Sequence, residues 1–129
     1  MHELSLAISI LEIVSQEVSD HFGGGASAGG RLDSVAVRIG KLSGVEPEAL
    51  EFAWEVARER SPFPGARLEI DLVPVRARCS GCGEPFEIDA MICVCPACGP
   101  APFRVVEGRE IEVSRIVWRE REAEEVRKG

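Results

Sequence analysis

Cys79-Ser-Gly-Cys82-Gly and Cys95-Pro-Ala-Cys98-Gly are the two segments around which we expect this chain to fold. Each is a C-x-x-C pair followed by glycine, and a tight turn lets sulfurs at positions i and i+3 approach one ion. The glycine after each pair can adopt the positive φ that turns backbone N–H groups towards the sulfurs. Four thiolates at about 2.3 Å fill a tetrahedral shell, so the spacing predicts a structural metal site, not a catalytic one.

The identity of the ion is open at this point. Zinc is the expected ion, but Cys-x-x-Cys-Gly followed by Cys-Pro-x-Cys-Gly also resembles the knuckles of rubredoxin, which would favour iron. Two disulfides are a third interpretation. A fifth cysteine, Cys93, and the lack of a signal-peptide pattern argue against it. A C-x-C pairing of Cys93 with Cys95 could replace the second pair, although Cys95 and Cys98 make the better-shaped turn.

Composition excludes several classes of protein. The 129 residues suit one domain, or one domain with a small insertion. No apolar run approaches the roughly 20 residues that span a bilayer, so we expect no membrane segment and a cytoplasmic location. The net charge is −7 and the arginines are scattered, which argues against a nucleic-acid partner. With His2 and His21 as the only histidines, no hydrolytic metal constellation is visible, and we expect no enzyme.

Hydrophobic periodicity predicts a small α+β fold. The expected elements are helices over residues 4–22 and 47–59 and strands over 31–41, 68–73 and 110–118, with a short strand near Phe86 and Ile88. The strand over 31–41 should have one buried side, carrying Val35, Val37 and Ile39. Trp54 should anchor the core.

The first helix should bury one face. The residues of that expected face are Leu4, Ala7, Ile8, Leu11, Val14, Val18 and Phe22. The second helix should bury Leu50, Ala53, Trp54 and Ala57.

The order of the elements predicts two helices packed on a small three-stranded sheet, with an inserted zinc-ribbon-like module. We expect residues 1–75 and 105–118 to form one domain and residues 76–104 to form the inserted metal-binding domain. Residues 119–129 should be a charged tail.

Met1-His2-Glu3 precedes the first helix directly. A free α-amine, the His2 amide nitrogen and the His2 imidazole Nδ1 can form two fused chelate rings with three nitrogens in one plane. Such tetragonal geometry favours Ni(II) or Cu(II) over zinc. Glu3 could supply a further donor. The alternative interpretation is a histidine that merely lies in solvent.

Three segments resemble the HypA/HybF family of hydrogenase nickel-incorporation proteins. They are Met1-His2-Glu3 with Ser5, the run Arg38-Ile-Gly-Lys-Leu-Ser-Gly-Val45 followed by Pro47-Glu-Ala-Leu-Glu-Phe-Ala53, and the two cysteine knuckles. The resemblance covers nearly the whole chain, including the late Gly108-Arg-Glu110 segment, and the segments occur in the family's order.

The resemblance implies a nickel metallochaperone that works with the GTPase HypB to load the large subunit of [NiFe]-hydrogenase, and some relatives also serve urease. It implies that His2 binds nickel with the Met1 amine, and that Cys79, Cys82, Cys95 and Cys98 hold structural zinc. Glu46 matches a position where an acidic side chain completes the nickel shell in relatives; its other role is that of a carboxylate at a helix start. Monomer and homodimer both remain open, as do an iron electron carrier and a zinc-ribbon adaptor as rival functions.

Overall fold

The computed structural model describes residues 2–22, 30–89 and 93–120. By contacts the chain divides into two compact units. One comprises Met1–Val37, Glu46–Ile70 and Val113–Gly129, and the other comprises Arg38–Val45 and Asp71–Glu112. The Met1 amine and the segment 121–129 of the expected charged tail lie outside the described residues. The described part of the chain has no helix long and apolar enough to cross a membrane.

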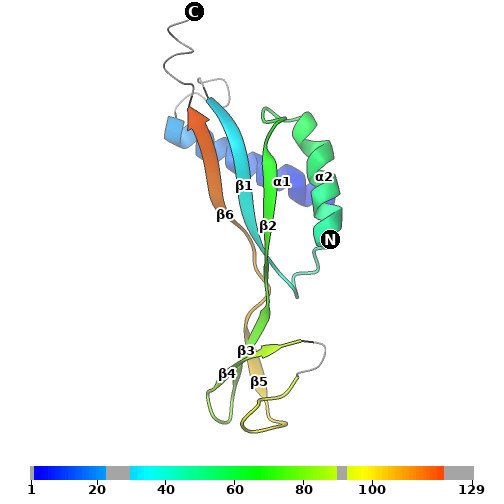
Figure 1. Ribbon diagram of the computed structural model, residues 1–129, viewed down its shortest axis with the longest axis vertical. Coiled ribbons are helices and arrows are strands. Elements are labelled where there is room, and N and C mark those ends of the chain that lie inside the picture. Colours follow the sequence, from blue (N-terminus) through cyan, green and yellow to red (C-terminus); the bar gives the residue numbers. More distant parts are fainter. Residues whose placement is uncertain (1, 23–29, 90–92, 121–129) are drawn as a thin grey trace, which may run out of the picture. The chain divides into compact units, whose positions relative to one another are not determined.

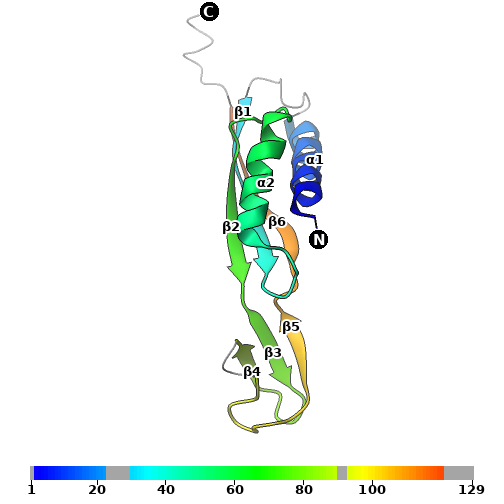
Figure 2. The same cartoon turned by 90° about the vertical axis from the view of Figure 1, so that its right-hand side faces the viewer.

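Two helices and most of a three-stranded sheet build the larger unit, while one end of each strand of that sheet belongs to the smaller unit. Helix α1 spans Glu3–Phe22 and α2 spans Pro47–Glu59. The strands are β1 (Gly30–Gly40), β2 (Arg67–Val73) and β6 (Ile111–Glu120), in the order β2-β1-β6. Helix α1 crosses one face of this sheet and α2 runs beside α1 (Figures 1 and 2). The predicted α+β class, with two helices on a small sheet, is confirmed.

Helix α2 starts and packs as its sequence predicts. Pro47 occupies the first turn, where its missing N–H costs nothing. The buried residues are Leu50, Ala53, Trp54 and Ala57, as expected. Trp54 is 1 % exposed, and its Nε1–H donates to the carbonyl of Ala66 at 2.9 Å. An indole buried with its polar hydrogen satisfied is a strong anchor for a small core.

The buried face of α1 differs from the prediction. Leu4 and Ile8 are 47 % and 46 % exposed, whereas Ile10, which was not predicted to be buried, is 3 % exposed. The buried face of α1 consists of Ala7, Leu11, Val14 and Val18, as predicted, together with Ile10 in place of Leu4 and Ile8. An apolar helix with several possible stripes does not fix its own rotation, because the partner surface decides which stripe is covered.

Strand β1 is buried on both sides, which corrects the prediction of one buried side. Val35 and Val37 are buried as expected, but Ser34 and Ala36 are also only 3 % and 8 % exposed. As the central strand, β1 has a neighbour on each side. An ion pair between Arg115 of β6 and Glu69 of β2, at 2.8 Å, joins the two flanking strands across it.

The smaller unit contains a second sheet that the sequence did not reveal. Its strands are β3 (Val75–Cys79), β4 (Pro85–Ile88) and β5 (Phe103–Glu107), in the order β4-β3-β5. Both pairings are antiparallel, with Ala77 opposite Phe86 on one side and Val105 on the other. The predicted short strand near Phe86 is therefore β4. The hydrophobic core of the smaller unit is formed by Ala77, Cys79, Phe86 and Cys95.

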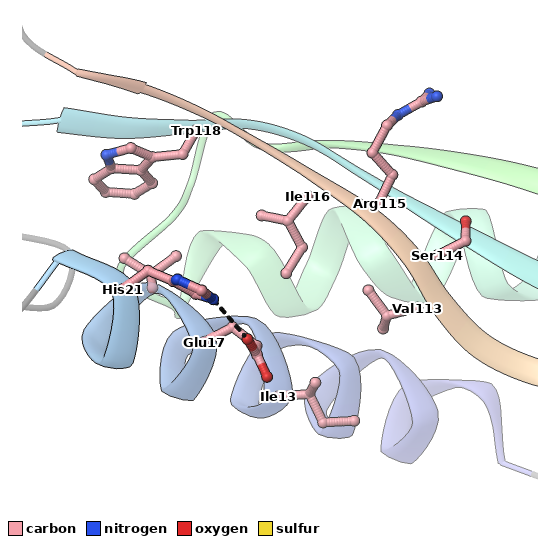
Figure 3. Close-up of a pocket in the computed structure, with 9 residues that line it drawn as sticks. Ile13, Glu17, His21, Val113, Ser114, Arg115, Ile116 and Trp118 are labelled. Carbon is pink, nitrogen blue, oxygen red and sulfur yellow. Dashed lines mark ion pairs between the residues drawn. The ribbon is translucent and has the colours of Figure 1, made fainter.

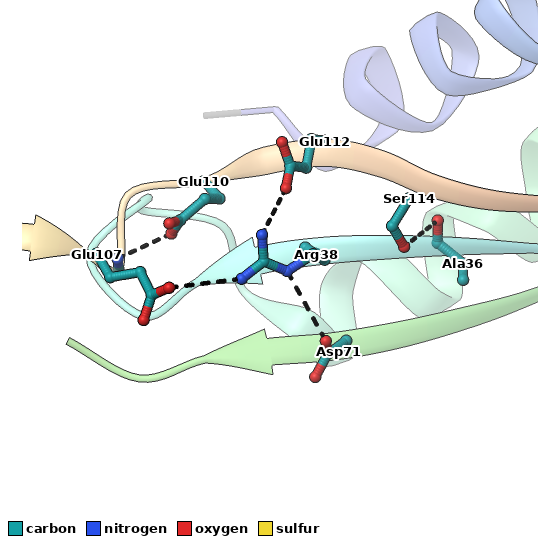
Figure 4. A network of polar contacts seen from close by, with 8 residues as sticks. Ala36, Arg38, Asp71, Glu107, Glu110, Glu112 and Ser114 are labelled. Atoms are coloured by element: carbon teal, nitrogen blue, oxygen red, sulfur yellow. Dashed lines mark hydrogen bonds and ion pairs between the residues drawn. The ribbon is translucent and has the colours of Figure 1, made fainter. Parts of the chain in front are cut away.

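One guanidinium in the smaller unit, that of Arg38 on β1, approaches carboxylates on three other strands. Arg38 of β1 contacts Glu112 of β6 at 2.7 Å, and it lies 3.9–4.0 Å from Glu107 and Asp71 (Figure 4).

The carboxylate of Glu110 accepts a hydrogen bond from the N–H of Gly108 at 2.8 Å. Gly108 has a φ of +121°, and a Cβ there would lie 2.8 Å from the Cα of Val75. Only glycine fits this approach of two backbones.

We predict a pH-dependent role for Asp33 in the larger unit. Its carboxylate accepts from Arg67 at 3.2 Å and lies 3.4 Å from Arg119. Although desolvation raises the pKa of Asp33, the hydrogen bonds from Arg67 and Arg119 hold it below its usual 3.8. A lowered folded-state pKa means that the ionised carboxylate stabilises the fold above about pH 4, and that this contribution disappears as pH falls through the folded pKa.

Thermal melts of wild type and Asp33→Asn, followed by tryptophan fluorescence, check this expectation. Trp54 and Trp118, the only tryptophans, lie in the larger unit. The variant should melt lower than wild type at pH 7, and the difference should shrink progressively as the pH falls below 3.8 through the folded-state pKa of Asp33. A difference that stays constant with pH would show that Asp33 contributes through shape and not through charge.

Candidate metal centre

Four thiols converge at the end of the smaller sheet. Cys79 ends β3, Cys82 lies in the turn before β4, and Cys95 and Cys98 form the second knuckle before β5. All four Sγ atoms lie within 4.8 Å of one another, and those of Cys82 and Cys95 are 3.7 Å apart. Tetrahedral coordination at about 2.3 Å requires sulfurs about 3.8 Å apart. The cluster therefore has the dimensions of a four-thiolate metal site.

The two knuckles have matching backbones. The N–H of Gly83 donates to the carbonyl of Cys79 at 2.9 Å, and the N–H of Gly99 donates to Cys95 at 2.8 Å. Both glycines have positive φ, +77° and +72°, as the sequence predicted. Cys79 and Cys95 are each 2 % exposed, whereas the later cysteine of each pair is exposed. One buried and one exposed sulfur from each knuckle thus make up the cluster.

Backbone N–H groups supply positive potential to the sulfurs. The Gly81 N–H donates to Cys79 Sγ at 3.3 Å, and the Cys98 N–H donates to Cys95 Sγ at 3.4 Å. Hydrogen bonds from the backbone of Cys82 and then Gly81 lower the pKa of the Cys79 thiol to about 7. Hydrogen bonds to Cys82 and Cys79 raise the pKa of Cys98 to about 12. Without a metal, some of the four thiols would keep their protons. A cation would displace these protons on binding, because the thiolate is the form that binds metals.

Gly83 offers a test of the knuckle backbone. A Cβ at Gly83 would meet no atom within 4 Å, so alanine there costs only the left-handed backbone conformation, about 1–2 kcal/mol. We expect Gly83→Ala to weaken metal retention by about 5–30-fold in competition with a chelator. Gly65→Ala is the matched control, since Gly65 is equally open but lacks positive φ. Equal retention in both variants would contradict a role for the knuckle geometry.

Cys93 lies outside the cluster. Its Sγ is exposed and lies 3.6 Å from the carbonyl oxygen of Asp89. The group of thiols close enough to share an ion contains Cys95 with Cys98, and Cys93 is not part of it. The structure thus brings together the i, i+3 pair that the sequence favoured.

The start of the chain belongs to the larger unit. His2 is exposed, and its carbonyl accepts from the N–H of Leu6 at 3.1 Å, which opens α1. The neighbouring Glu3 carboxylate accepts from the N–H of Glu46 at 3.0 Å. This hydrogen bond makes the largest contribution to holding the pKa of Glu3 below its usual 4.5. The second largest contribution is a hydrogen bond from the backbone of Glu3 itself.

Contact between Glu3 and Glu46 was not visible in the sequence. Glu46 is the residue before α2, and its N–H cannot be paired within that helix. An acidic side chain near a helix start was the only available signal, and it pointed to Glu46 and not to its partner, Glu3. The contact brings Glu3, and therefore the adjacent His2, close to the start of α2.

The protein has an α+β fold and a cluster of four thiols on a separate small sheet. These features place it in the class of small metal-binding α+β proteins. Comparisons with known proteins narrow the class. The family model described as "Hydrogenase/urease nickel incorporation, metallochaperone, hypA" matches residues 1–118, and the chain belongs to this HypA family. The family consists of metallochaperones and not of catalytic enzymes.

Individual relatives agree with the family assignment. The chain is 40 % identical over 117 residues to the hydrogenase maturation factor HypA of Geobacter metallireducens, covering 90 % of this chain and 97 % of the relative. It is 39 % identical over 120 residues to that of Roseiflexus sp., with 92 % of each chain covered. The solution structure of the Ni metallochaperone HypA from Helicobacter pylori matches with a TM-score of 0.62 over 95 % of this chain and 100 % of that chain, at 23 % identity, which supports the fold alone.

Proposed function

We propose that this protein binds Ni(II) at its chain start and delivers it for the maturation of [NiFe]-hydrogenase, while the four cysteines hold a resident zinc ion. The observation that carries the proposal is the exposed His2 beside the Glu3–Glu46 contact, in a chain of a nickel-incorporation family. An exposed ligand can be reached by an acceptor, whereas a closed shell of four thiolates retains its ion.

The tetrathiol cluster fits zinc. Four thiolates, two of them buried, leave no open coordination position, and such a site is structural. Zinc would supply folding free energy there, because thiolates far apart in the unfolded chain come together only around the ion. Cys79 and Cys95, which pack with Ala77 and Phe86, would supply the two buried thiolates, and the N–H groups of Gly81 and Cys98 orient the sulfurs.

Nickel is the cargo. We assign its capture to the Met1 amine, the His2 amide nitrogen and the His2 imidazole, which together present nitrogens suited to tetragonal Ni(II). Because amine, amide and imidazole must lose protons to bind, nickel binding releases protons and nickel release takes them up. Glu3 is committed to the N–H of Glu46, so we assign it the role of holding His2 near α2. The Glu46 side chain is the further candidate donor.

The same proposal covers partners and domains. We assign the HypB GTPase and the [NiFe]-hydrogenase large subunit as partners, with urease accessory proteins as a further group. Residues 1–75 and 105–118 form the nickel domain and 76–104 the zinc domain in this proposal. We place the protein in the cytoplasm, where thiolate ligands stay reduced.

A calorimetric titration of untagged, zinc-loaded protein with Ni(II) tests the proposal. We expect one Ni(II) per chain in addition to one zinc. No nickel binding with zinc retained would leave a zinc-ribbon adaptor as the better interpretation. Purified protein that absorbs in the visible through ferric tetrathiolate would instead indicate an iron electron carrier.

A further inference from the structure

A groove of about 500 Å³ lies between helix α1 and strand β6 in the larger unit. Ile13, Glu17 and His21 line it from the helix, and Val113, Ile116 and Trp118 line it from the strand (Figure 3). Ile13 is 50 % exposed, and the apolar side chains of Val113 and Ile116 line the same groove. The groove therefore has apolar walls on both sides and is open to solvent.

One wall of this groove is the edge of a sheet. In the order β2-β1-β6, strand β6 pairs with β1 alone among the described strands. An edge strand presents a row of N–H and C=O groups that can pair with another extended chain. Ser114 and Arg115, in the middle of this edge, are exposed. The groove thus combines apolar side chains with an available backbone ladder.

We propose that this groove binds an extended segment of a partner protein, which adds to β6 as a fourth strand. A helical occupant pairs its own backbone and would leave the β6 edge without partners. An extended segment pairs with the edge and turns every second side chain into the groove. Those side chains would pack on Ile13, Val113 and Ile116. Strand addition is therefore the binding mode that uses both features of the groove.

Charge specifies the segment further. The Glu17 carboxylate lies on the helical wall, 3.4 Å from His21 Nε2, and the chain carries a net charge of −7. The one cationic lining residue, Arg115, points away from the helix (Figure 3), and its guanidinium pairs with Glu69 at 2.8 Å. A basic residue in the partner would consequently compete with His21, and not with Arg115, for the Glu17 carboxylate. The expected segment has alternating apolar residues and at least one Lys or Arg.

Panning a random decapeptide display library against the zinc-loaded full-length protein tests this proposal. We expect enrichment of peptides with apolar residues at every second position and a basic residue among them. Ile13→Lys should weaken binding of the selected peptides at least tenfold. Ile8→Lys is the matched control, because Ile8 lies on the same helix with 46 % exposure but lines a different groove, between α1 and α2. Both positions are half exposed, so both variants should fold.

Amide hydrogen exchange on the complex supplies the structural readout. Bound peptide should slow exchange along residues 111–120 and change the emission of Trp118. Peptides enriched with helical spacing, equal loss of binding in both variants, unchanged exchange along β6, or no enrichment at all would each overturn the proposal. Peptide binding should be unaffected by His2→Ala, which separates this surface from the nickel site.

Discussion

His2→Ala should reduce nickel affinity by at least about 100-fold, which exceeds the 10–100-fold that loss of an outer-shell partner costs. The substitution removes the only imidazole at the chain start, and with it one chelate ring around the ion. His2 is exposed and contributes only its carbonyl to α1, so alanine should leave the fold intact. Calorimetry with Ni(II) and zinc analysis on the same sample measure both effects.

The other histidine provides the control. His21 lies at the far end of α1 and pairs with Glu17, so His21→Ala should bind nickel as wild type does. A second variant tests the amine directly. One additional residue before Met1 displaces the amine from its chelate ring and should weaken nickel binding without changing any side chain. Undiminished affinity in either His2→Ala or the extended chain would refute the assignment of nickel to the chain start.

Removing the zinc ion that we assign to the four cysteines should unfold the smaller unit and leave the larger one folded. Structural zinc contributes on the order of 10–16 kcal/mol in small metal-dependent folds, which is comparable with the whole stability of a typical domain, about 5–15 kcal/mol. Without the ion, Cys79 and Cys95 lose the bonds that hold both knuckles in a core otherwise made of Ala77 and Phe86. Treatment with a strong chelator should therefore collapse the amide signals of residues 75–107 in a heteronuclear NMR spectrum.

Trp54 reports on the larger unit in the same experiment. The tryptophan fluorescence should stay near that of the zinc-loaded protein, because Trp54 is buried on α2 and bonded to the carbonyl of Ala66, and Trp118 also belongs to the larger unit. Cys95→Ser should mimic chelation, whereas Cys93→Ser should not, since Cys93 is not part of the cluster. A chelated protein with unchanged signals from the smaller unit would mean that β3, β4 and β5 fold without metal.

Local chemistry decided which features were predictable. Cysteine knuckles are specified by residue type and spacing within a few positions, and the glycines after them have the predicted positive φ. Helix α2 has a proline at its start and one clear apolar stripe, so both its bounds and its buried face were correct. The roles of His2 and of the four cysteines as metal ligands stay predictions, although the thiols do lie together.

Features that depend on distant partners were not predictable. The rotation of α1, the burial of Ser34 and Ala36, and the sheet formed by β3 and β5 all depend on what packs from elsewhere in the chain. Strand β5 has a mixed pattern, with Phe103 exposed at 39 % yet in edge-to-face contact with Phe86 at 5.7 Å. Such a strand shows no clean alternation. The Glu3–Glu46 hydrogen bond likewise joins residues that no local pattern connects.

The segments of the two units alternate along the chain. The smaller unit takes Arg38–Val45 as well as Asp71–Glu112, and backbone hydrogen bonds from Lys41 to Val73 and from Leu42 to Gly108 join these two pieces. No single excision or fusion point yields either unit whole. Recombination between homologous genes would preserve both only by exchanging two separate coding blocks together. Chimeras built from relatives should therefore swap both pieces, and a one-block transplant of the cysteine region would leave the donated strands without their original backbone partners.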